Sequence, residues 1–267
     1  MAQATIPVAV TGASGKMAQE ALNAIGRDPE LRLVGASSRR IDGPRRTLPG
    51  AGETPVFRDV GSLLEKVRAR VLVDFTVAEA AMDHARTAFR HRVSPVIGTT
   101  GLSQDNLREL EDLSLSTGLG AVVAPNFALG AVLMVHLASI ASRYFEYSEI
   151  VELHHEGKVD APSGTALATA RAMAKALGRP FQWKAPQRET LPGTRGGQIE
   201  GVGIHSIRLP GLVAHQEVIF GTTGQTLSIR HDSISRESFM PGLLLAIKEV
   251  VKRDRLVLGL GKLLGLE

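Results

Sequence analysis

The feature that most constrains the fold is an alternation of short apolar runs with helical patterns over residues 1–125. The apolar runs are continuous, which is typical of strands in a parallel sheet that is covered on both faces. Such an order of strands and helices predicts a doubly wound α/β domain. The strands are expected at 6–10, 31–37, 70–76, 94–100 and 120–125, with helices at 16–25, 78–90 and 104–115.

The pattern changes after residue 126, where three strand candidates follow one another without a helix between them. A loop rich in proline and glycine is expected over 179–200, and a turn at 221–224 is expected to join two strands as a hairpin. These elements predict a second domain of the α+β class. Its helices are expected at 130–144, 165–177 and 236–252, and its strands at 147–155, 201–210, 215–221 and 225–231.

Composition removes several classes of function. The chain has no cysteine, which excludes disulfides, thiolate metal sites and cysteine nucleophiles. A formal charge of +4 with one tryptophan and two tyrosines favours solvated basic loops over a nucleic-acid surface. No apolar run is long enough to span a membrane, and no secretory signal is recognisable at the first residues. We therefore expect a cytoplasmic protein without nucleic-acid or membrane partners.

A glycine-rich turn, GASGKM at 12–17, joins the first strand to the first helix. Such a turn lets the backbone approach a pyrophosphate, and the helix N-terminus adds free N–H groups. It is not a P-loop, which would need glycine in place of Val10 and a hydroxyl residue in place of Met17. A plain structural turn is the alternative. Two more strand ends, 98–101 and 125–126, carry small polar residues where ligands bind in open α/β sheets.

The densest group of polar side chains follows the strand candidate 147–155. Histidine and lysine are suited to proton transfer, and a Ser-Gly-Thr sequence that opens a helix is suited to anion binding. Two alternatives are a metal site, for which no third ligand is close, and a capped helix beside a solvated turn. The residues of this group are His154, His155, Lys158, Asp160, Ser163, Gly164 and Thr165.

The same segments carry a resemblance that runs nearly end to end. The chain resembles the bacterial 4-hydroxy-tetrahydrodipicolinate reductases (dihydrodipicolinate reductases) of the lysine and diaminopimelate pathway. The HHxxKxDAPSGTA pattern is the most specific element of the resemblance. The matching segments are GASGKM (12–17), VDFT (73–76), GTTG (98–101), APNF (124–127), ELHHEGKVDAPSGTA (152–166) and IHSIRLPGLVAHQEVIFG (204–221).

The resemblance implies an architecture. A Rossmann-like dinucleotide-binding domain is expected over 1–126, and a substrate-binding and oligomerisation domain on a mixed sheet over 127–236. The last segment, 237–267, would return to the first domain. The sheet of the second domain would form the contacts of a homotetramer.

The resemblance also implies a reaction, the reduction of 4-hydroxy-tetrahydrodipicolinate, or its dehydrated form, to tetrahydrodipicolinate with NADPH or NADH. His154 would be the proton donor and acceptor, Lys158 a second proton donor, and no metal is expected. The substrate would be contacted by His155, Ser163, Gly164 and Thr165. The cofactor pyrophosphate would lie on Gly12, Ala13, Ser14, Gly15, Lys16 and Met17. The nicotinamide end would lie along Gly98, Thr99, Thr100, Ala124, Pro125, Asn126 and Phe127.

Cofactor preference depends on the end of the second strand, which reads Ser37-Ser38-Arg39-Arg40. Many dinucleotide-binding folds place a carboxylate there to hold the ribose hydroxyls. Its absence, with Arg39 able to bind a 2′-phosphate, predicts that NADPH is preferred and NADH is possible. Two other functions stay open at this point. One is an NAD(P)-dependent amino-acid dehydrogenase of the aspartate type, and the other is a non-catalytic nucleotide sensor.

Overall fold

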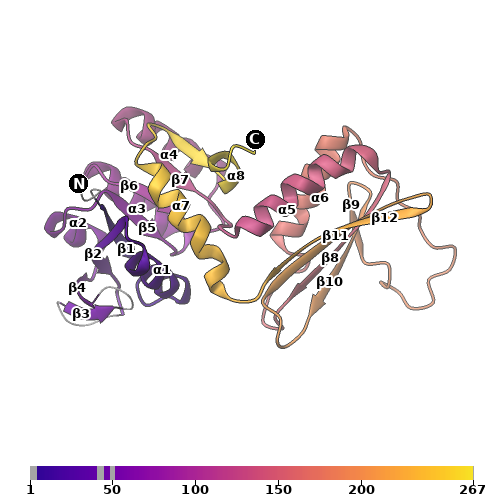
Figure 1. Cartoon of the computed structure of the whole chain (residues 1–267), viewed down its shortest axis with the longest axis horizontal. Coiled ribbons are helices and arrows are strands. Elements are labelled where there is room, and N and C mark those ends of the chain that lie inside the picture. The colour runs from indigo at the N-terminus through magenta and orange to yellow at the C-terminus, as the bar shows by residue number, and fades with distance from the viewer. Residues whose placement is uncertain (1–4, 41–44, 49–51, 267) are drawn as a thin grey trace. The chain divides into compact units, whose positions relative to one another are not determined.

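The computed structural model describes residues 5–40, 45–48 and 52–266, and the chain divides into two compact units. Unit 1 comprises Met1–Phe127 and Phe239–Glu267, and unit 2 comprises Ala128–Ser238. Figure 1 shows an α/β arrangement in unit 1, and α5 and α6 beside a sheet in unit 2. None of the helices in the described part of the chain is both long enough and apolar enough to span a membrane.

Unit 1 is built on an eight-stranded sheet in the order β13-β7-β6-β5-β1-β2-β4-β3. Every pairing is parallel except β3 with β4, and the chain order reverses at β1. This confirms the doubly wound fold that the apolar runs predict. The strands are β1 (Ile6–Thr11), β2 (Leu31–Ser37), β3 (Arg45–Leu48), β4 (Gly52–Phe57), β5 (Val71–Asp74), β6 (Ser94–Ile97), β7 (Ala121–Val123) and β13 (Leu256–Leu258).

Helices cover both faces of this sheet, which explains why β5 and β6 are buried at every position. α2, α3 and α4 contact one another in series, whereas α1 contacts α7, which also contacts β5, β6 and β7. The last segment of the chain thereby belongs to the core of unit 1. The helices are α1 (Lys16–Arg27), α2 (Val60–Lys66), α3 (Ala78–Arg90), α4 (Gln104–Thr117), α7 (Met240–Val250) and α8 (Leu260–Leu263).

Unit 2 is built on a five-stranded sheet in the order β12-β11-β8-β10-β9. β8 is central and pairs parallel with β10 and antiparallel with β11, so the sheet is mixed as expected. α5 (Leu129–Ala141) and α6 (Gly164–Leu177) pack on one face. The strands are β8 (Tyr147–His154), β9 (Gly197–Ile199), β10 (Val202–Arg208), β11 (Ala214–Thr222) and β12 (Gln225–Ser233).

Alternation along β8 decides which side chains face the helices. Ser148, Ile150 and Glu152 are buried on the inner face, and the residues between them are half-buried on the outer face. The core on the inner face is apolar around Ile150 and Phe220. Glu152 is the charged exception, and it lies near the end of the strand that leads to the polar cluster.

Several expected boundaries differ from the structure. The strands expected at 70–76, 94–100 and 120–125 are shorter in the structure, where pairing ends at Asp74, Ile97 and Val123 and the following residues leave the sheet. The helix expected from 236 begins at Met240, after a 3₁₀ turn, η2 (Arg236–Phe239). A second 3₁₀ turn, η1 (Ser142–Tyr144), extends α5, and β9 lies within the expected loop 179–200.

Candidate active site

The turn after β1 has the geometry that close approach of a ligand requires. Gly12 has a φ of +71°, and a Cβ there would meet Thr76 Cγ2 at 2.8 Å, so only glycine fits. The Ala13 N–H donates to the Ser37 carbonyl at 3.0 Å, which anchors the turn to β2. Gly15, the N-cap of α1, supplies no side-chain cap. Within the described residues, the first N–H groups of α1 therefore lack a capping side chain and face an exposed turn, which suits a pyrophosphate.

The next strand along the edge, β5, ends in a buried carboxylate. Asp74 accepts hydrogen bonds from the N–H and hydroxyl of Thr76 at 2.7 and 2.6 Å and from His84 Nδ1 at 2.7 Å. It thereby fixes Thr76, whose methyl group lies against Gly12. The VDFT segment is part of the family resemblance, but the sequence predicted no role for Asp74.

The ends of β6 and β7 continue the same edge. The Gly98 N–H donates to the Asp74 carbonyl at 2.8 Å, and the Ala124 N–H donates to the Ile97 carbonyl at 3.0 Å. The rings of Phe75 and Phe127 meet edge to face, 5.9 Å apart. The structure thus brings together, along the carboxyl edge of one sheet, all the segments expected to hold a dinucleotide. These are Gly12–Met17 after β1, Gly98–Thr100 after β6 and Ala124–Phe127 after β7.

The end of β2 is tied to the glycine turn by hydroxyl groups. Ser38 donates to the Ser14 hydroxyl at 3.1 Å, and Ser37 donates to that of Thr11 at 2.9 Å. Arg39 and Arg40 follow and are exposed. Asp42, the next acidic residue in the sequence, lies outside the described residues.

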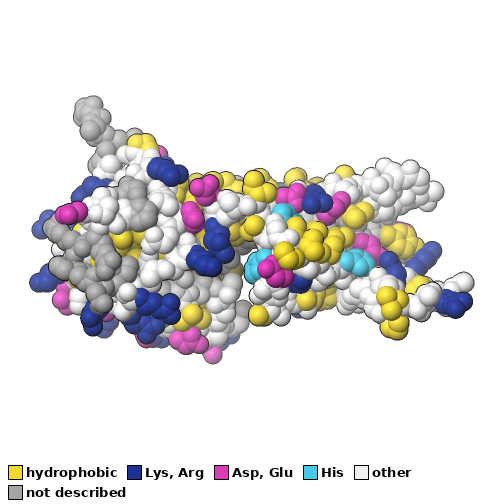
Figure 2. Space-filling view, turned by 90° about the horizontal axis from the view of Figure 1, so that it is seen from below, with side chains coloured by type: hydrophobic (Ala, Val, Ile, Leu, Met, Phe, Trp, Pro, Cys, Tyr) yellow, Lys and Arg dark blue, Asp and Glu magenta, His cyan; other side chains and the backbone are white. Residues whose placement is uncertain are grey.

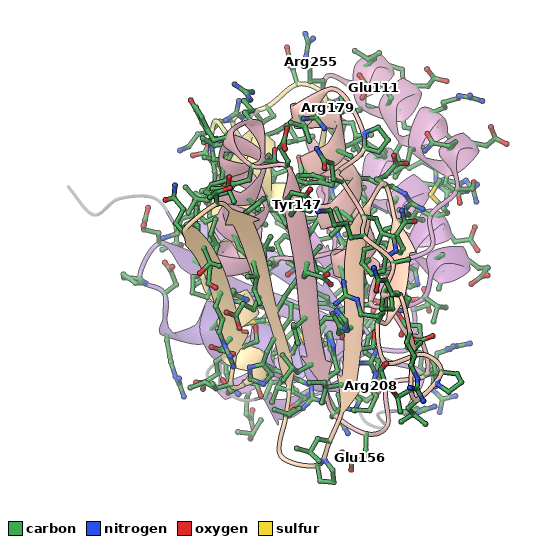
Figure 3. All side chains as sticks on the ribbon, turned by 90° about the vertical axis from the view of Figure 1, so that its right-hand side faces the viewer. Glu111, Tyr147, Glu156, Arg179, Arg208 and Arg255 are labelled. Carbon is green, nitrogen blue, oxygen red and sulfur yellow. The ribbon has the colours of Figure 1, made fainter. Side chains whose placement is uncertain are left out.

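In unit 2, the candidate catalytic residues surround Glu152, whose side chain is fully buried. Its Oε2 accepts from His154 Nδ1 at 2.5 Å, and its Oε1 accepts from the Ser163 N–H at 3.2 Å. Arg208 donates to both oxygens, at 2.9 and 2.8 Å. Figure 3 shows Arg208 at the same end of the sheet as Glu156, which follows β8, whereas Tyr147 marks the other end of β8.

Sequence reasoning missed both Glu152 and Arg208. A signal for Glu152 was present, because residues two apart on a strand lie on the same face, and Glu152 is two residues before His154. For Arg208 no local signal exists, since it meets Glu152 through the pairing of β10 with β8.

Burial lowers the pKa of His154 below its ordinary value, although the hydrogen bond from its Nδ1 to Glu152 opposes the effect. Burial raises the pKa of Glu152, but hydrogen bonds from Arg208, Ser206 and His154 outweigh it and hold that pKa below the usual range. Glu152 is therefore a carboxylate at neutral pH. Because Nδ1 of His154 is engaged, Nε2 is the ring nitrogen left to exchange a proton with a ligand.

The loop after β8 carries the remaining polar candidates. Lys158 Nζ contacts Asp160 Oδ1 at 2.6 Å, and this lysine lowers the pKa of the Asp160 carboxyl. His155 is exposed, and its carbonyl accepts from the Lys158 N–H at 3.2 Å. Within the part of the chain that the structure describes, no three His, Asp or Glu side chains are grouped so that they could hold a metal ion.

The start of α6 buries Ser163 and exposes Gly164. Ser163 is only 3% exposed, and its hydroxyl accepts from the Ala166 N–H at 3.1 Å, so it caps the helix. Gly164 is exposed, and a Cβ there would have no heavy atom within 4 Å. The Thr165 carbonyl accepts from the Thr169 hydroxyl at 2.7 Å. The helix N-terminus is therefore open at Gly164, one residue after Ser163, whose N–H shares the Glu152 carboxylate with His154.

Arg195 and Arg236, which no motif covers, lie elsewhere. Arg195 contacts Glu149 at 2.5 Å and stacks on Trp183, with 4.7 Å from its guanidinium to the ring centroid. Glu149 is on the face of β8 opposite Glu152, so Arg195 is not part of the cluster. Arg236 is exposed in η2.

A parallel α/β unit with a glycine turn at its carboxyl edge, followed in the chain by a mixed-sheet unit with a histidine–carboxylate pair, is the arrangement that the sequence analysis expects of a nicotinamide-dependent oxidoreductase. Solved structures agree at the level of fold. The amine dehydrogenase from Mycobacterium smegmatis is 15% identical with a TM-score of 0.62, covering 95% of this chain and 96% of that one. GenD2 from gentamicin A biosynthesis, solved with NAD, is 14% identical with a TM-score of 0.61, covering 94% and 88%.

The chain belongs to the dihydrodipicolinate reductase family. The model of the family's N-terminal part matches residues 6–127, and that of its C-terminal part matches residues 130–264. This confirms the resemblance seen in the motifs.

Individual relatives agree over nearly the full length of the chain. The 4-hydroxy-tetrahydrodipicolinate reductase of Dehalococcoides mccartyi strain BAV1 is 51% identical over 98% of this chain and 99% of its own. That of Bacillus subtilis is 44% identical over 97% and 98%. The dipicolinate-bound dihydrodipicolinate reductase from Paenisporosarcina sp. TG-14 is 40% identical with a TM-score of 0.87, covering 97% and 99%. This chain is therefore an oxidoreductase that uses a nicotinamide cofactor.

Proposed function

We propose that this chain reduces 4-hydroxy-tetrahydrodipicolinate, or its dehydrated form, to tetrahydrodipicolinate in lysine and diaminopimelate biosynthesis. The observation that carries the proposal is the arrangement around Glu152, where a histidine and the open N-terminus of α6 share one buried carboxylate. The names of the relatives support it, and nothing in the structure favours the amino-acid dehydrogenase or the nucleotide sensor.

The cofactor fits the carboxyl edge of the sheet in unit 1. Its pyrophosphate would lie on the turn 12–17, where Gly12 gives close approach and the first N–H groups of α1 face the charge. Its nicotinamide end would lie along Gly98, Thr99, Thr100 and the segment 124–127. When bound, the cofactor supplies a hydride to the substrate.

The substrate and the proton are handled by unit 2. The substrate is a dicarboxylate, as is the dipicolinate bound to the Paenisporosarcina reductase. Its negative carboxylates would be bound by Lys158, His155 and the N-terminal turn of α6 at Gly164 and Thr165. The Ser163 cap orders this turn. If the hydroxylated form binds, its hydroxyl group leaves as water to give the unsaturated cyclic imine. Hydride addition to a ring carbon of that imine leaves electron density that must take up one proton. His154 would deliver it from Nε2, with Lys158 as a second donor.

Arg39 supports a preference for NADPH. It is exposed directly after Ser38, which is bonded to Ser14 of the glycine turn, so the guanidinium begins close to the adenosine end of the proposed cofactor site. A guanidinium fork matches a 2′-phosphate, and a carboxylate that would repel the phosphate is absent from 37–40. NADH would still bind through the rest of the turn.

We propose that the protein is a homotetramer in the cytoplasm, and the outer face of the sheet in unit 2 supports the homotetramer. No helix of unit 2 covers that face, and half-buried Val151 and Leu153 lie on it beside Ile207, which is 40% exposed. Figure 2 shows hydrophobic side chains among histidines and acidic groups on one face of unit 2. Such a patch suits a self-complementary contact. Light scattering tests the tetramer, and a stable monomer of 28.5 kDa would contradict it.

The experiment that tests the function is a coupled assay with the upstream synthase, following NADPH absorbance. We expect the wild type to oxidise NADPH only when the cyclic imine is supplied, and not with oxaloacetate and ammonia. His154→Ala and Lys158→Ala should each lower kcat by about 10²–10⁴-fold, the usual contribution of a positioned proton donor. NADPH binding, measured by fluorescence, should be retained in both. Near-normal turnover in both variants would show that these residues are not the proton donors.

A further inference from the structure

One ion pair, Glu152 with Arg208, contacts three segments of the polar cluster in unit 2. Glu152 accepts from His154 and from the N–H of Ser163, which begins the turn into α6. Arg208 holds both oxygens of Glu152 and also donates from Nη2 to the Asp160 carbonyl at 2.7 Å. Asp160 in turn contacts Lys158. The proton donor, the lysine loop and the helix N-terminus therefore converge on two side chains to which the sequence analysis gave no role.

Burial makes this pair unlike a surface salt bridge. Glu152 is fully buried, and the side chain of Arg208 is 18% exposed. Desolvating two charges offsets much of their attraction, so a buried pair adds little net stability over apolar residues of the same volume. Removal of one partner, however, leaves an uncompensated buried charge. Stability of the sheet alone thus gives no physical reason for this pair at this position.

We propose that Glu152 and Arg208 are positioning residues, which hold His154, the Lys158 loop and the start of α6 in one arrangement and balance the charge beside His154. Glu152 orients the imidazole through Nδ1, which leaves Nε2 to the ligand. Arg208 fixes both oxygens of Glu152, so the carboxylate cannot rotate away from the ring. This inference rests on the proposed role of His154 as the proton donor.

The two members of the pair act on His154 in opposite directions. The Glu152 anion stabilises the imidazolium, whereas Arg208 on β10 and Lys158 in the following loop destabilise it. From β11, the residue paired with His154 is the uncharged Ala214, and Asp160 is engaged by Lys158. The positive end of the α6 dipole adds to the cationic side. The Glu152 anion thus favours the protonated form of His154, and the cationic neighbours favour the release of its proton.

The test uses Glu152→Gln, Arg208→Gln and the double variant of the full-length protein. Glu152→Gln keeps the volume and an acceptor but removes the charge, so the pKa of His154 should fall. Arg208→Gln should raise it. Both pKa shifts of His154 are read directly from imidazole NMR signals during a pH titration, which requires no substrate.

In the kinetic assay, the alkaline limb of the pH profile of kcat should move to lower pH in Glu152→Gln and to higher pH in Arg208→Gln. Each single variant should lose about tenfold or more in kcat, with KM for NADPH unchanged.

A matched control exists on the same strand. Glu149 contacts Arg195 at 2.5 Å and His205 at 2.7 Å, a carboxylate–arginine–histidine group like the first but on the opposite face of β8. Glu149→Gln should leave the titration of His154 and the pH profile of kcat unchanged.

The outcomes separate the inference from the proposed function. Opposite shifts in the two single variants support the charge-balanced pair. No shift, or shifts of the same sign, would overturn it and leave a structural role only. If Arg208→Gln does not fold, Glu152→Gln and the double variant carry the test, because the double variant buries no unpaired ion and its His154 should titrate nearer to the wild type than in either single variant. If the wild type fails to reduce the cyclic imine, the proposed function is wrong, while the NMR titration still decides the charge balance.

Discussion

The substitution Gly98→Ala tests whether the carboxyl edge of the sheet at β5, β6 and β7 requires a residue without a side chain at position 98. A Cβ at Gly98 would lie 2.2 and 2.5 Å from two carbons of the Phe75 ring and 3.0 Å from Phe127 Cε2. Carbon atoms pack at about 3.5–4.0 Å, so the Phe75 ring must retreat by about 1 Å or more. That ring is in edge-to-face contact with Phe127, and the displacement therefore passes to a second buried ring.

The magnitude follows from overpacking. Extra methyl groups in a packed region cost about 1–3 kcal/mol, and a domain of this size loses about 2–4 °C of melting temperature per kcal/mol. We therefore expect Gly98→Ala to melt about 2–12 °C lower than the wild type. Because the displaced ring lies at the proposed nicotinamide end, KM for NADPH should rise about tenfold or more.

The assay is calorimetry together with initial rates at varied NADPH concentration. Gly197→Ala is the matched control, since a Cβ there would have no heavy atom within 4 Å and its φ is ordinary. The control should keep the melting temperature and the KM for NADPH of the wild type. Wild-type values of both quantities in Gly98→Ala would refute the reasoning, because they would mean that the phenylalanine rings move freely and that no cofactor group lies beside them.

Three further substitutions give independent checks. Arg39→Ala should reduce the preference for NADPH over NADH in kcat/KM by about ten- to a hundredfold, which corresponds to about 1–3 kcal/mol, and an unchanged ratio would remove Arg39 from the cofactor site. Gly164→Ala should keep the melting temperature, since its Cβ meets open space, but raise the KM for the cyclic imine; an unchanged KM would place the substrate elsewhere. Asp59→Ala removes the cap of α2, where Ser62 donates from its N–H to the carboxylate at 2.8 Å, and should cost about 1 kcal/mol in urea unfolding at pH 7. The hydrogen bond from the N–H of Ser62 lowers the pKa of Asp59 in the folded state. The stability that the ionised Asp59 contributes is therefore fully present above a pH of about 4 and is lost as the pH falls through the lowered pKa. A difference in unfolding free energy between wild type and variant that persists below the lowered pKa would contradict this origin.

Local patterns determined most of the secondary structure. The helix expected at 78–90 and the strand expected at 31–37 have those bounds in the structure. Gly178 ends α6 with a φ of +79°, as a glycine after a helical pattern predicts. Continuous apolar runs predicted a parallel sheet because only strands covered on both faces need them. The missed elements lack such a signal, since β4 contains proline and polar residues and β13 has three residues.

The motifs determined the family, and the comparisons confirmed it. They did not determine how the candidate residues are held. Asp74 meets His84 because α3 packs beside β5, and Arg208 meets Glu152 because β10 pairs with β8 in a register that places Arg208 opposite His154. Arg208 and Glu152 are 56 positions apart in the chain. A single sequence carries no periodicity that encodes a strand register over that separation, because register depends on which buried faces match across the whole sheet. The sequence therefore marks the residues expected to carry the chemistry, and only the packed sheet decides which buried ion pair orients them.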